Sequence, residues 1–137
     1  PPIWRAAHRP GLLAVAGREG DGVIAAFVDP AEFARRRELA ELARAQAGRP
    51  ALAHCLYTYV LPLTAESNTW LRAQADALGT TTAALRRWLA TTGIVAPADE
   101  MADRLADFAA VGATDAVLCM NDRMPSEAWH ALAEAVL

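Results

Sequence analysis

Short runs of consecutive apolar residues alternate with helical patterns along this chain of 137 residues. In residues 23–27 and 116–119 the apolar residues are continuous and do not alternate with polar ones. Such runs are typical of strands that are buried on both faces of a parallel sheet. Strands are predicted at residues 2–7, 22–27, 51–60 and 115–120. The pattern predicts an α/β fold of about four βα units, in a single domain over residues 1–137.

The predicted helices between these strands have clear boundary signals. Asp29 is followed by Pro30 and, three residues after the Asp, by Glu32, which predicts a helix capped by Asp29 and ending near Gly48. Two further helices are predicted, one after Pro97 and one after Pro125. Their predicted apolar faces are Met101, Leu105, Phe108 and Val111 in the first, and Trp129, Leu132, Ala133 and Val136 in the second.

Residues 64–93 interrupt this alternation with two predicted helices in succession. The first begins at the Thr-Ala-Glu-Ser sequence from Thr64 and ends at Gly79, and the second covers residues 82–90. A simple βα unit needs one helix between two strands, so residues 64–93 are predicted to be a helical insertion after the third strand. Its role is packing within the domain or, alternatively, a lid or an oligomer contact.

Charge and composition argue against several kinds of partner. All thirteen basic residues are Arg, the formal net charge is −3, and the dense basic cluster at residues 35–37 lies among Glu residues. A solvated helix face is therefore predicted there, and no nucleic acid is expected as a partner. No apolar run approaches the ~18 residues that a membrane span needs, so no membrane partner is expected and a cytoplasmic location is predicted.

The two cysteines, Cys55 and Cys119, lie in the apolar strand-like runs. Buried free thiols are predicted for both, rather than a disulfide. No Cys-x-x-Cys or His-rich spacing indicates zinc, and no metal site is predicted.

Two stretches of the chain resemble the luciferase-like monooxygenase superfamily. Residues 2–24 contain Pro-Ile-Trp-Arg-Ala-Ala-His-Arg-Pro, then a helix ending in Ala-Gly, then Gly-Asp-Gly-Val-Ile, and residues 98–113 resemble the unit that closes the family's barrel. The resemblance implies a TIM-type (β/α) barrel. Because a complete barrel has eight strands, the chain is expected to be its second, C-terminal half.

The same resemblance implies a flavin-dependent oxidoreductase or monooxygenase. The family uses FMN or the deazaflavin coenzyme F-420, and the Ala-Ala-x-x-Pro form of residues 6–10 is nearer to the deazaflavin branch. The expected reaction is hydride transfer to, or oxygen activation for, a small organic substrate. No catalytic residue is predicted, because in such enzymes the flavin carries the redox chemistry.

The resemblance places the cofactor phosphate at the turn after the first strand. On this chain the corresponding residues are Ala7, His8, Arg9 and Gly11. Free backbone N–H groups and the positive end of a helix dipole stabilise an anion at such a turn, and Arg9 can add a charge-assisted hydrogen bond. The family usually has Ser and Gly where His8 and Arg9 stand. The alternative is that both are ordinary polar residues of an exposed turn.

Other candidate residues lie near the ends of the later strands. Tyr57 is predicted to line the cofactor site or, alternatively, to pack in the core. Asn121, with Asp122 and Arg123, either holds the tail of a substrate or cofactor or only forms a turn and a helix start. His54 lies earlier on its strand and is predicted to be a core residue or a second-layer residue behind the site.

A half barrel leaves open strand edges and an uncovered inner face, which favour pairing with another chain. The expected partner is the missing N-terminal half of the barrel or a second copy, as in a homodimer. The lone chain is not expected to turn over. The alternative functions are a non-catalytic half-barrel module for assembly or flavin binding, and an unrelated open α/β domain whose resemblance is accidental.

Overall fold

The computed structural model describes residues 1–120 and 124–136, which cluster in two compact units. Unit 1 comprises Pro1–Tyr57 and Asp107–Val117, and unit 2 comprises Thr58–Ala106 and Leu118–Leu137. The assignments of residues 1–137 to a single domain and of residues 64–93 to an insertion stay predictions.

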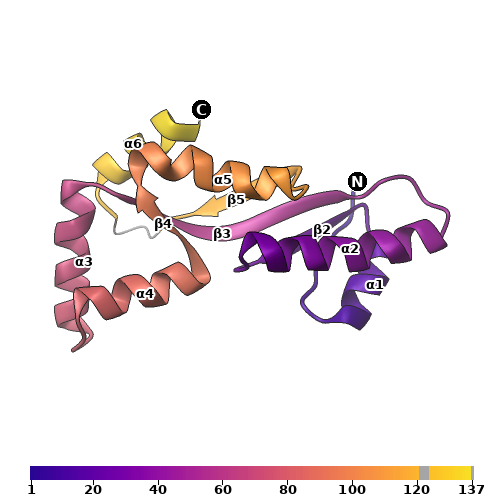
Figure 1. Cartoon of the computed structure of the whole chain (residues 1–137), viewed down its shortest axis with the longest axis horizontal. Coiled ribbons are helices and arrows are strands. Elements are labelled where there is room, and N and C mark those ends of the chain that lie inside the picture. The colour runs from indigo at the N-terminus through magenta and orange to yellow at the C-terminus, as the bar shows by residue number, and fades with distance from the viewer. Residues whose placement is uncertain (121–123, 137) are drawn as a thin grey trace. The chain divides into compact units, whose positions relative to one another are not determined.

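Unit 1 is built from parallel strands joined by helices, as the continuous apolar runs predict (Figure 1). The first strand pairs in parallel with the second, with Ala6 opposite Ile24. The second strand pairs in parallel with the third, with Ala26 opposite Tyr57. Its elements are β1 (Trp4–Ala6), α1 (Pro10–Glu19), β2 (Gly22–Ala26), α2 (Pro30–Gln46) and the first part of β3 (Ala53–Leu63).

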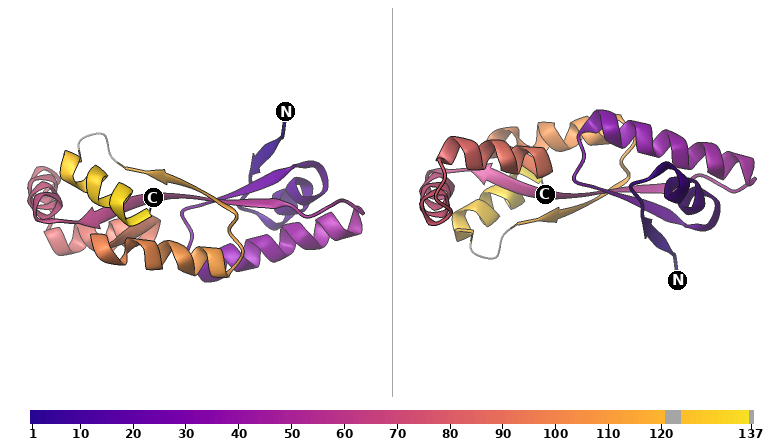
Figure 2. Two further views of the ribbon diagram at one scale, coloured as in Figure 1. Left: turned by 90° about the horizontal axis from the view of Figure 1, so that it is seen from above. Right: turned by 90° about the horizontal axis from the view of Figure 1, so that it is seen from below.

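Helices α1 and α2 pack closely against each other in unit 1. Gly17 makes this possible, because a Cβ at this position would overlap the backbone carbonyl oxygen of Ala40. Figure 2 shows α2 running beside the strands of this unit. The buried cluster between the helices and the strands consists of Ala7, Leu13, Ala16, Val23, Ala40 and Leu52.

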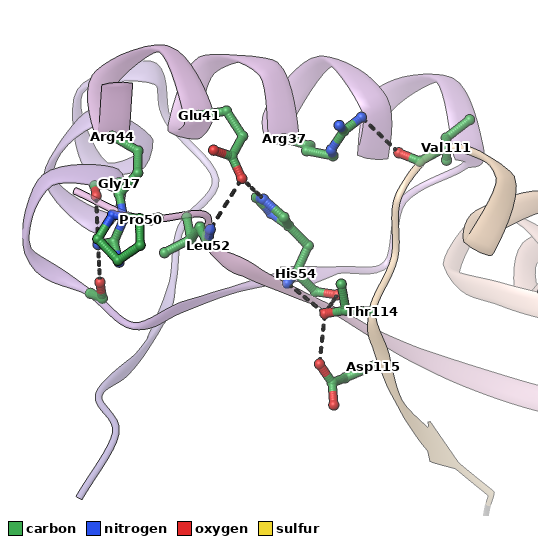
Figure 3. Close-up of polar contacts among 11 residues, drawn as sticks. Gly17, Arg37, Glu41, Arg44, Pro50, Leu52, His54, Val111, Thr114 and Asp115 are labelled. Carbon is green, nitrogen blue, oxygen red and sulfur yellow. Dashed lines mark hydrogen bonds and ion pairs between the residues drawn. The ribbon is translucent and has the colours of Figure 1, made fainter. Parts of the chain in front are cut away.

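Polar contacts tie α2 to β3 and to the chain before the last strand (Figure 3). The Nε2 atom of the buried His54 lies 2.7 Å from Oε1 of Glu41, and the His54 backbone N–H donates to the hydroxyl oxygen of Thr114 over 2.9 Å. Arg37 donates to the carbonyl oxygen of Val111. His54 is therefore a core residue, as predicted. Next to it, burial raises the pKa of the Cys55 thiol, which keeps this thiol in its unreactive protonated form.

Unit 2 contains the second part of β3, which pairs in parallel with β4 (Gly93–Pro97). Helices α3 (Ala65–Ala77) and α4 (Thr82–Thr92) are adjacent, and α6 (Ser126–Val136) packs against α3 and the short helix η1 (Ala98–Glu100). Helix α5 (Met101–Ala110) and strand β5 (Asp115–Cys119) contribute to both units. The buried core of unit 2 consists of Leu61, Leu71, Ala75, Leu85, Met124 and Ala128.

Strand β4 was not predicted, and β3 extends three residues beyond the predicted end at Val60. The apolar run at 94–96 is short, and Gly93 before it signals only the end of a helix, so the sequence pattern does not reveal a strand. Gly93 allows the close pairing, because a Cβ there would overlap the carbonyl oxygen of Tyr59.

Two predictions of burial near the C-terminus were wrong. Strand β5 is exposed along its first three residues, with Val117 46% exposed, and Cys119 is half-buried. In α6 the buried side chains are Ala128 and Leu132, whereas Trp129 and Val136 are exposed. An apolar sequence shows which residues favour burial, but the elements that pack on each face decide which are covered.

Both cysteines are free, as predicted. In the part of the chain that the structure describes, no helix combines the length and the apolar character that crossing a membrane requires. The cytoplasmic location stays a prediction.

Candidate functional site

The carboxyl edge of unit 1 carries most of the residues predicted to bind a cofactor. We use this name for residues 7–9 after β1, residues 27–29 after β2, and Tyr57 of β3, which lies level with the last residue of β2. In parallel α/β sheets, ligands bind outside this end of the strands. Because β3 continues to Leu63, Tyr57 lies within this strand rather than at its end.

The turn between β1 and α1 brings Ala7, His8, Arg9 and Gly11 together. Ala7 is buried beneath the turn, and its N–H donates to the carbonyl oxygen of Ile24. Arg9 is the N-cap of α1 without a side-chain cap, Pro10 begins the helix, and Gly11 is exposed with open space around its Cα. The first N–H groups of a helix have no intrahelical partner, so Gly11 and Leu12 present donors beside two basic side chains.

A chain of hydrogen bonds connects this turn to the first turns of α2. Nη1 of Arg36 lies 2.9 Å from Nδ1 of His8, and Nε of Arg36 donates to Glu32 over 2.6 Å. Glu32 also accepts two hydrogen bonds from Arg35. These bonds, from Arg35 first and then Arg36, lower the pKa of Glu32 to about 2. Glu32 is therefore ionised at neutral pH and holds both guanidinium groups in place.

The contact with Arg36 determines which nitrogen of His8 carries the proton. A guanidinium group has five N–H donors and no acceptor. The Nδ1 atom of His8 must therefore accept the hydrogen bond, and in the neutral ring the proton lies on Nε2. His8 thus presents an N–H donor on the side of the ring away from Arg36.

Asp29 and Tyr57 complete the described part of this edge. The Asp29 side chain accepts a hydrogen bond of 2.8 Å from the Glu32 backbone N–H, which confirms it as the N-cap of α2. Tyr57 is half-buried, and its ring meets the ring of Phe27 edge-on with centroids 5.5 Å apart. Asn121, Asp122 and Arg123 lie outside the described residues.

Unit 2 contains an apolar cavity of about 500 Å³. This volume lies within the range of small-molecule sites, roughly 300–1,000 Å³. Among residues 1–120 and 124–136, no charged side chain lines it, and Trp88 is 61% exposed. The lining residues are Tyr59, Val60, Leu61, Trp70, Trp88, Leu89, Gly93, Ile94, Val95, Met120 and Met124. Aromatic walls with flexible Met side chains suit a neutral apolar molecule.

The contact of Arg36 with the carboxyl edge and most of this cavity were not predicted from the sequence. Arg36 lies in the basic cluster predicted to be a solvated face, but its side chain is only 13% exposed and its contact with His8 spans 28 residues of sequence. No local pattern signals such a contact. Within residues 1–120 and 124–136, no group of three or more His, Cys, Asp or Glu residues is placed to hold a metal ion.

Comparison with known proteins found similarity in structure only. No model of a known protein family matches the chain, and no curated protein matches its sequence. The structure is similar to the coenzyme F-420-dependent tetrahydromethanopterin reductase from Methanopyrus kandleri, with a TM-score of 0.70 and 16% identity. The similarity covers 98% of this chain and 50% of that chain.

Two further solved structures have similar scores. The EDTA monooxygenase from Chelativorans sp. BNC1 aligns with a TM-score of 0.70 and 17% identity, covering 99% of this chain and 45% of that chain. The oxygenating constituent of 3,6-diketocamphane monooxygenase from Pseudomonas putida, in complex with FMN, aligns with a TM-score of 0.67 and 15% identity. This similarity covers 100% of this chain and 49% of that chain. This chain therefore spans about half the length of the proteins it resembles, which confirms the predicted half-barrel fold class.

Proposed function

We propose, from the half-barrel fold that this chain shares with luciferase-like monooxygenases, that it is the C-terminal part of a flavin- or deazaflavin-dependent oxidoreductase. The observation that carries the proposal is the β1–α1 turn, where His8, Arg9 and the start of α1 gather hydrogen-bond donors. Such donors fit the phosphate group that FMN and coenzyme F-420 both contain.

Within this proposal each residue of the turn has a distinct role. The N–H groups of Gly11 and Leu12 donate to the phosphate, Arg9 neutralises its charge, and His8 donates from Nε2. Ala7 lies buried beneath the turn, and Tyr57 contacts the cofactor from β3, two strands away from β1. The bound flavin supplies the redox chemistry. The neighbours include an F-420-dependent enzyme and one in complex with FMN, and the Ala-Ala-x-x-Pro sequence favours F-420 for this chain.

We propose that the chain works together with a partner that supplies the rest of the barrel. The matched structures are about twice as long. The exposed edge strand β1, with Trp4 38% exposed and Ile3 before it 53% exposed, supports a partner chain that pairs there. The partner is the N-terminal half of such a barrel or a second copy of this chain.

We further propose that the cavity of unit 2 binds the small organic substrate. The described residues that line it are uncharged and favour a neutral, apolar molecule, because an unpaired charge would lose its hydration against them without compensation.

The phosphate site is tested by substituting Arg36 in the full chain. Arg36→Met is expected to weaken FMN binding roughly five- to tenfold, because His8 loses the contact that holds its ring. Binding of riboflavin, which lacks the phosphate, should be unchanged. Native mass spectrometry and fluorescence titration with FMN, coenzyme F-420 and riboflavin measure these affinities.

Arg35→Met is the matched control for this substitution. Like Arg36→Met, it removes one positive charge and a hydrogen-bond donor to Glu32. The Arg35 side chain is 52% exposed, however, and the hydrogen bond to His8 comes from Arg36. We expect less than about a twofold effect. Equal losses from both variants would contradict the role of His8. A stable dimer that binds neither flavin would support the assembly module instead.

The cavity is tested by intrinsic tryptophan fluorescence. A neutral bicyclic ketone, 2-decalone, is expected to shift the emission saturably, and a carboxylate of the same size should bind at least about tenfold more weakly. Trp70 and Trp88 both line the cavity, so replacing both by Phe should remove most of the response, whereas Trp129→Phe, outside the cavity lining, should retain it. Equal binding of both compounds would contradict an uncharged substrate site.

A further inference from the structure

Phe27 has an unusual backbone conformation at the carboxyl edge of unit 1. Among residues 1–120 and 124–136 it is the one non-glycine residue with a positive φ, at 54°. For a bulky side chain this left-handed region is unfavourable, because the Cβ crowds the neighbouring carbonyl oxygen. Such strain persists where the surrounding structure holds it, and it is concentrated at functional sites.

The surrounding contacts hold this conformation in place. The Phe27 N–H donates to the carbonyl oxygen of Tyr57 over 3.0 Å. The two rings meet at an interplanar angle of 84°. The left-handed residue therefore ends β2 while its ring remains packed against β3.

The Phe27 ring is not buried in the hydrophobic core. Phe27 is 40% exposed, whereas Phe33 and Phe108 are buried and pack against each other. The strain therefore does not serve to bury apolar surface. It places an aromatic ring at the carboxyl edge, beside the strand whose turn carries His8 and Arg9.

We infer that Phe27 is a cofactor-binding residue, whose ring packs against the planar ring system of the flavin or deazaflavin. The inference rests on the proposed function and extends it from the phosphate to the ring system. A flat aromatic ligand gains stacking and apolar contact from an exposed phenyl ring. The edge-on contact with Tyr57 keeps the Phe27 ring oriented, so the ring does not have to reorient when the cofactor ring system binds.

The test compares Phe27→Leu with Phe27→Tyr in the full chain. Leu retains apolar bulk and the unfavourable left-handed conformation but has no aromatic face, whereas Tyr restores that face. The probes are FMN and lumiflavin, which is the isoalloxazine ring without the ribityl phosphate. Affinity and quenching of flavin fluorescence are measured at a temperature at which thermal melts show every variant to be folded.

Phe27→Leu is expected to weaken binding of both probes roughly three- to tenfold and to reduce the quenching. Phe27→Tyr should bind as the unchanged chain does. If Phe27→Leu binds both probes normally, Phe27 is not a ligand contact, although the proposed phosphate site stands. If the unchanged chain binds lumiflavin as tightly as FMN, the phosphate group adds no affinity and the proposed phosphate site is wrong. The Phe27→Leu variant still tests whether Phe27 contacts the ring system. If the chain binds neither of these probes nor coenzyme F-420, both proposals are overturned.

The strain itself is tested independently of any ligand. Phe27→Gly and Phe27→Ala both remove the ring, so the difference between their melting temperatures reports the cost of the backbone conformation. Gly is ordinarily the less stable of the two, but at a left-handed position it should have the higher melting temperature. A higher melting temperature for Phe27→Ala would show that the residue is not strained and would overturn the argument from conformation.

Discussion

Arg44→Met is expected to lower the free energy of unfolding by about 3–5 kcal/mol, because three backbone carbonyl groups lose a charged donor. The Arg44 side chain is buried, with the residue 3% exposed. Its Nε donates to the carbonyl oxygen of Pro50 over 2.6 Å, and its Nη1 donates to those of Gly20 and Gly17 over 2.6 and 3.2 Å (Figure 3). Urea denaturation followed by circular dichroism measures the loss.

The size of this effect follows from what Arg44 joins. Gly17 and Gly20 lie at the end of α1, where carbonyl groups lack intrahelical partners, and Pro50 lies before β3. Met fills a similar volume but leaves these acceptors without the guanidinium. Arg49→Met is the control, because Arg49 is partly exposed and donates to Arg18 and Asp21 at the surface. Its expected effect is below about 1 kcal/mol, and equal losses would contradict the importance of burial.

Gly17→Ala is expected to destabilise the chain by about 2–3 kcal/mol, because α1 and α2 would have to separate. The added Cβ would overlap the backbone of Ala40, and a backbone cannot move aside as a flexible side chain can. The free energy of unfolding, measured by urea denaturation, reports the change.

Gly11→Ala is the matched control within the same helix. A Cβ at Gly11 meets no atom within 4 Å, and replacing Gly by Ala in a helix stabilises it by up to about 1 kcal/mol. The two substitutions should therefore have opposite signs. A destabilising effect of similar size at both positions would show that the contact with Ala40 does not explain the effect at Gly17.

Both stability predictions concern the support of the candidate cofactor site. Gly17 and Arg44 hold α1 against α2 and the strands. Helix α1 carries the turn with His8 and Arg9, and α2 carries Arg36, which contacts His8. A shift between these two helices would therefore change the position of the donors proposed to bind the phosphate.

Features that depend on neighbouring residues could be predicted from the sequence. The alternation of strands and helices, the Asp29 cap and the two helices after β3 agree with the structure. The start of α3 at Thr64 is confirmed by a capping box with Ser67. Each of these depends on hydrogen bonds or apolar periodicity within a few residues, so the local sequence contains the necessary information.

The fold class, most of the elements and the turn that carries His8, Arg9 and Gly11 could thus be predicted from local sequence. Packing between distant elements sets the remaining features: the pairing of β4 with β3, the exposed face of β5, the apolar cavity, the contact of Arg36 with His8, and the conformation of Phe27. These features arise where elements distant in sequence meet. Their geometry depends on which surfaces pack together, and no local pattern of residues specifies that.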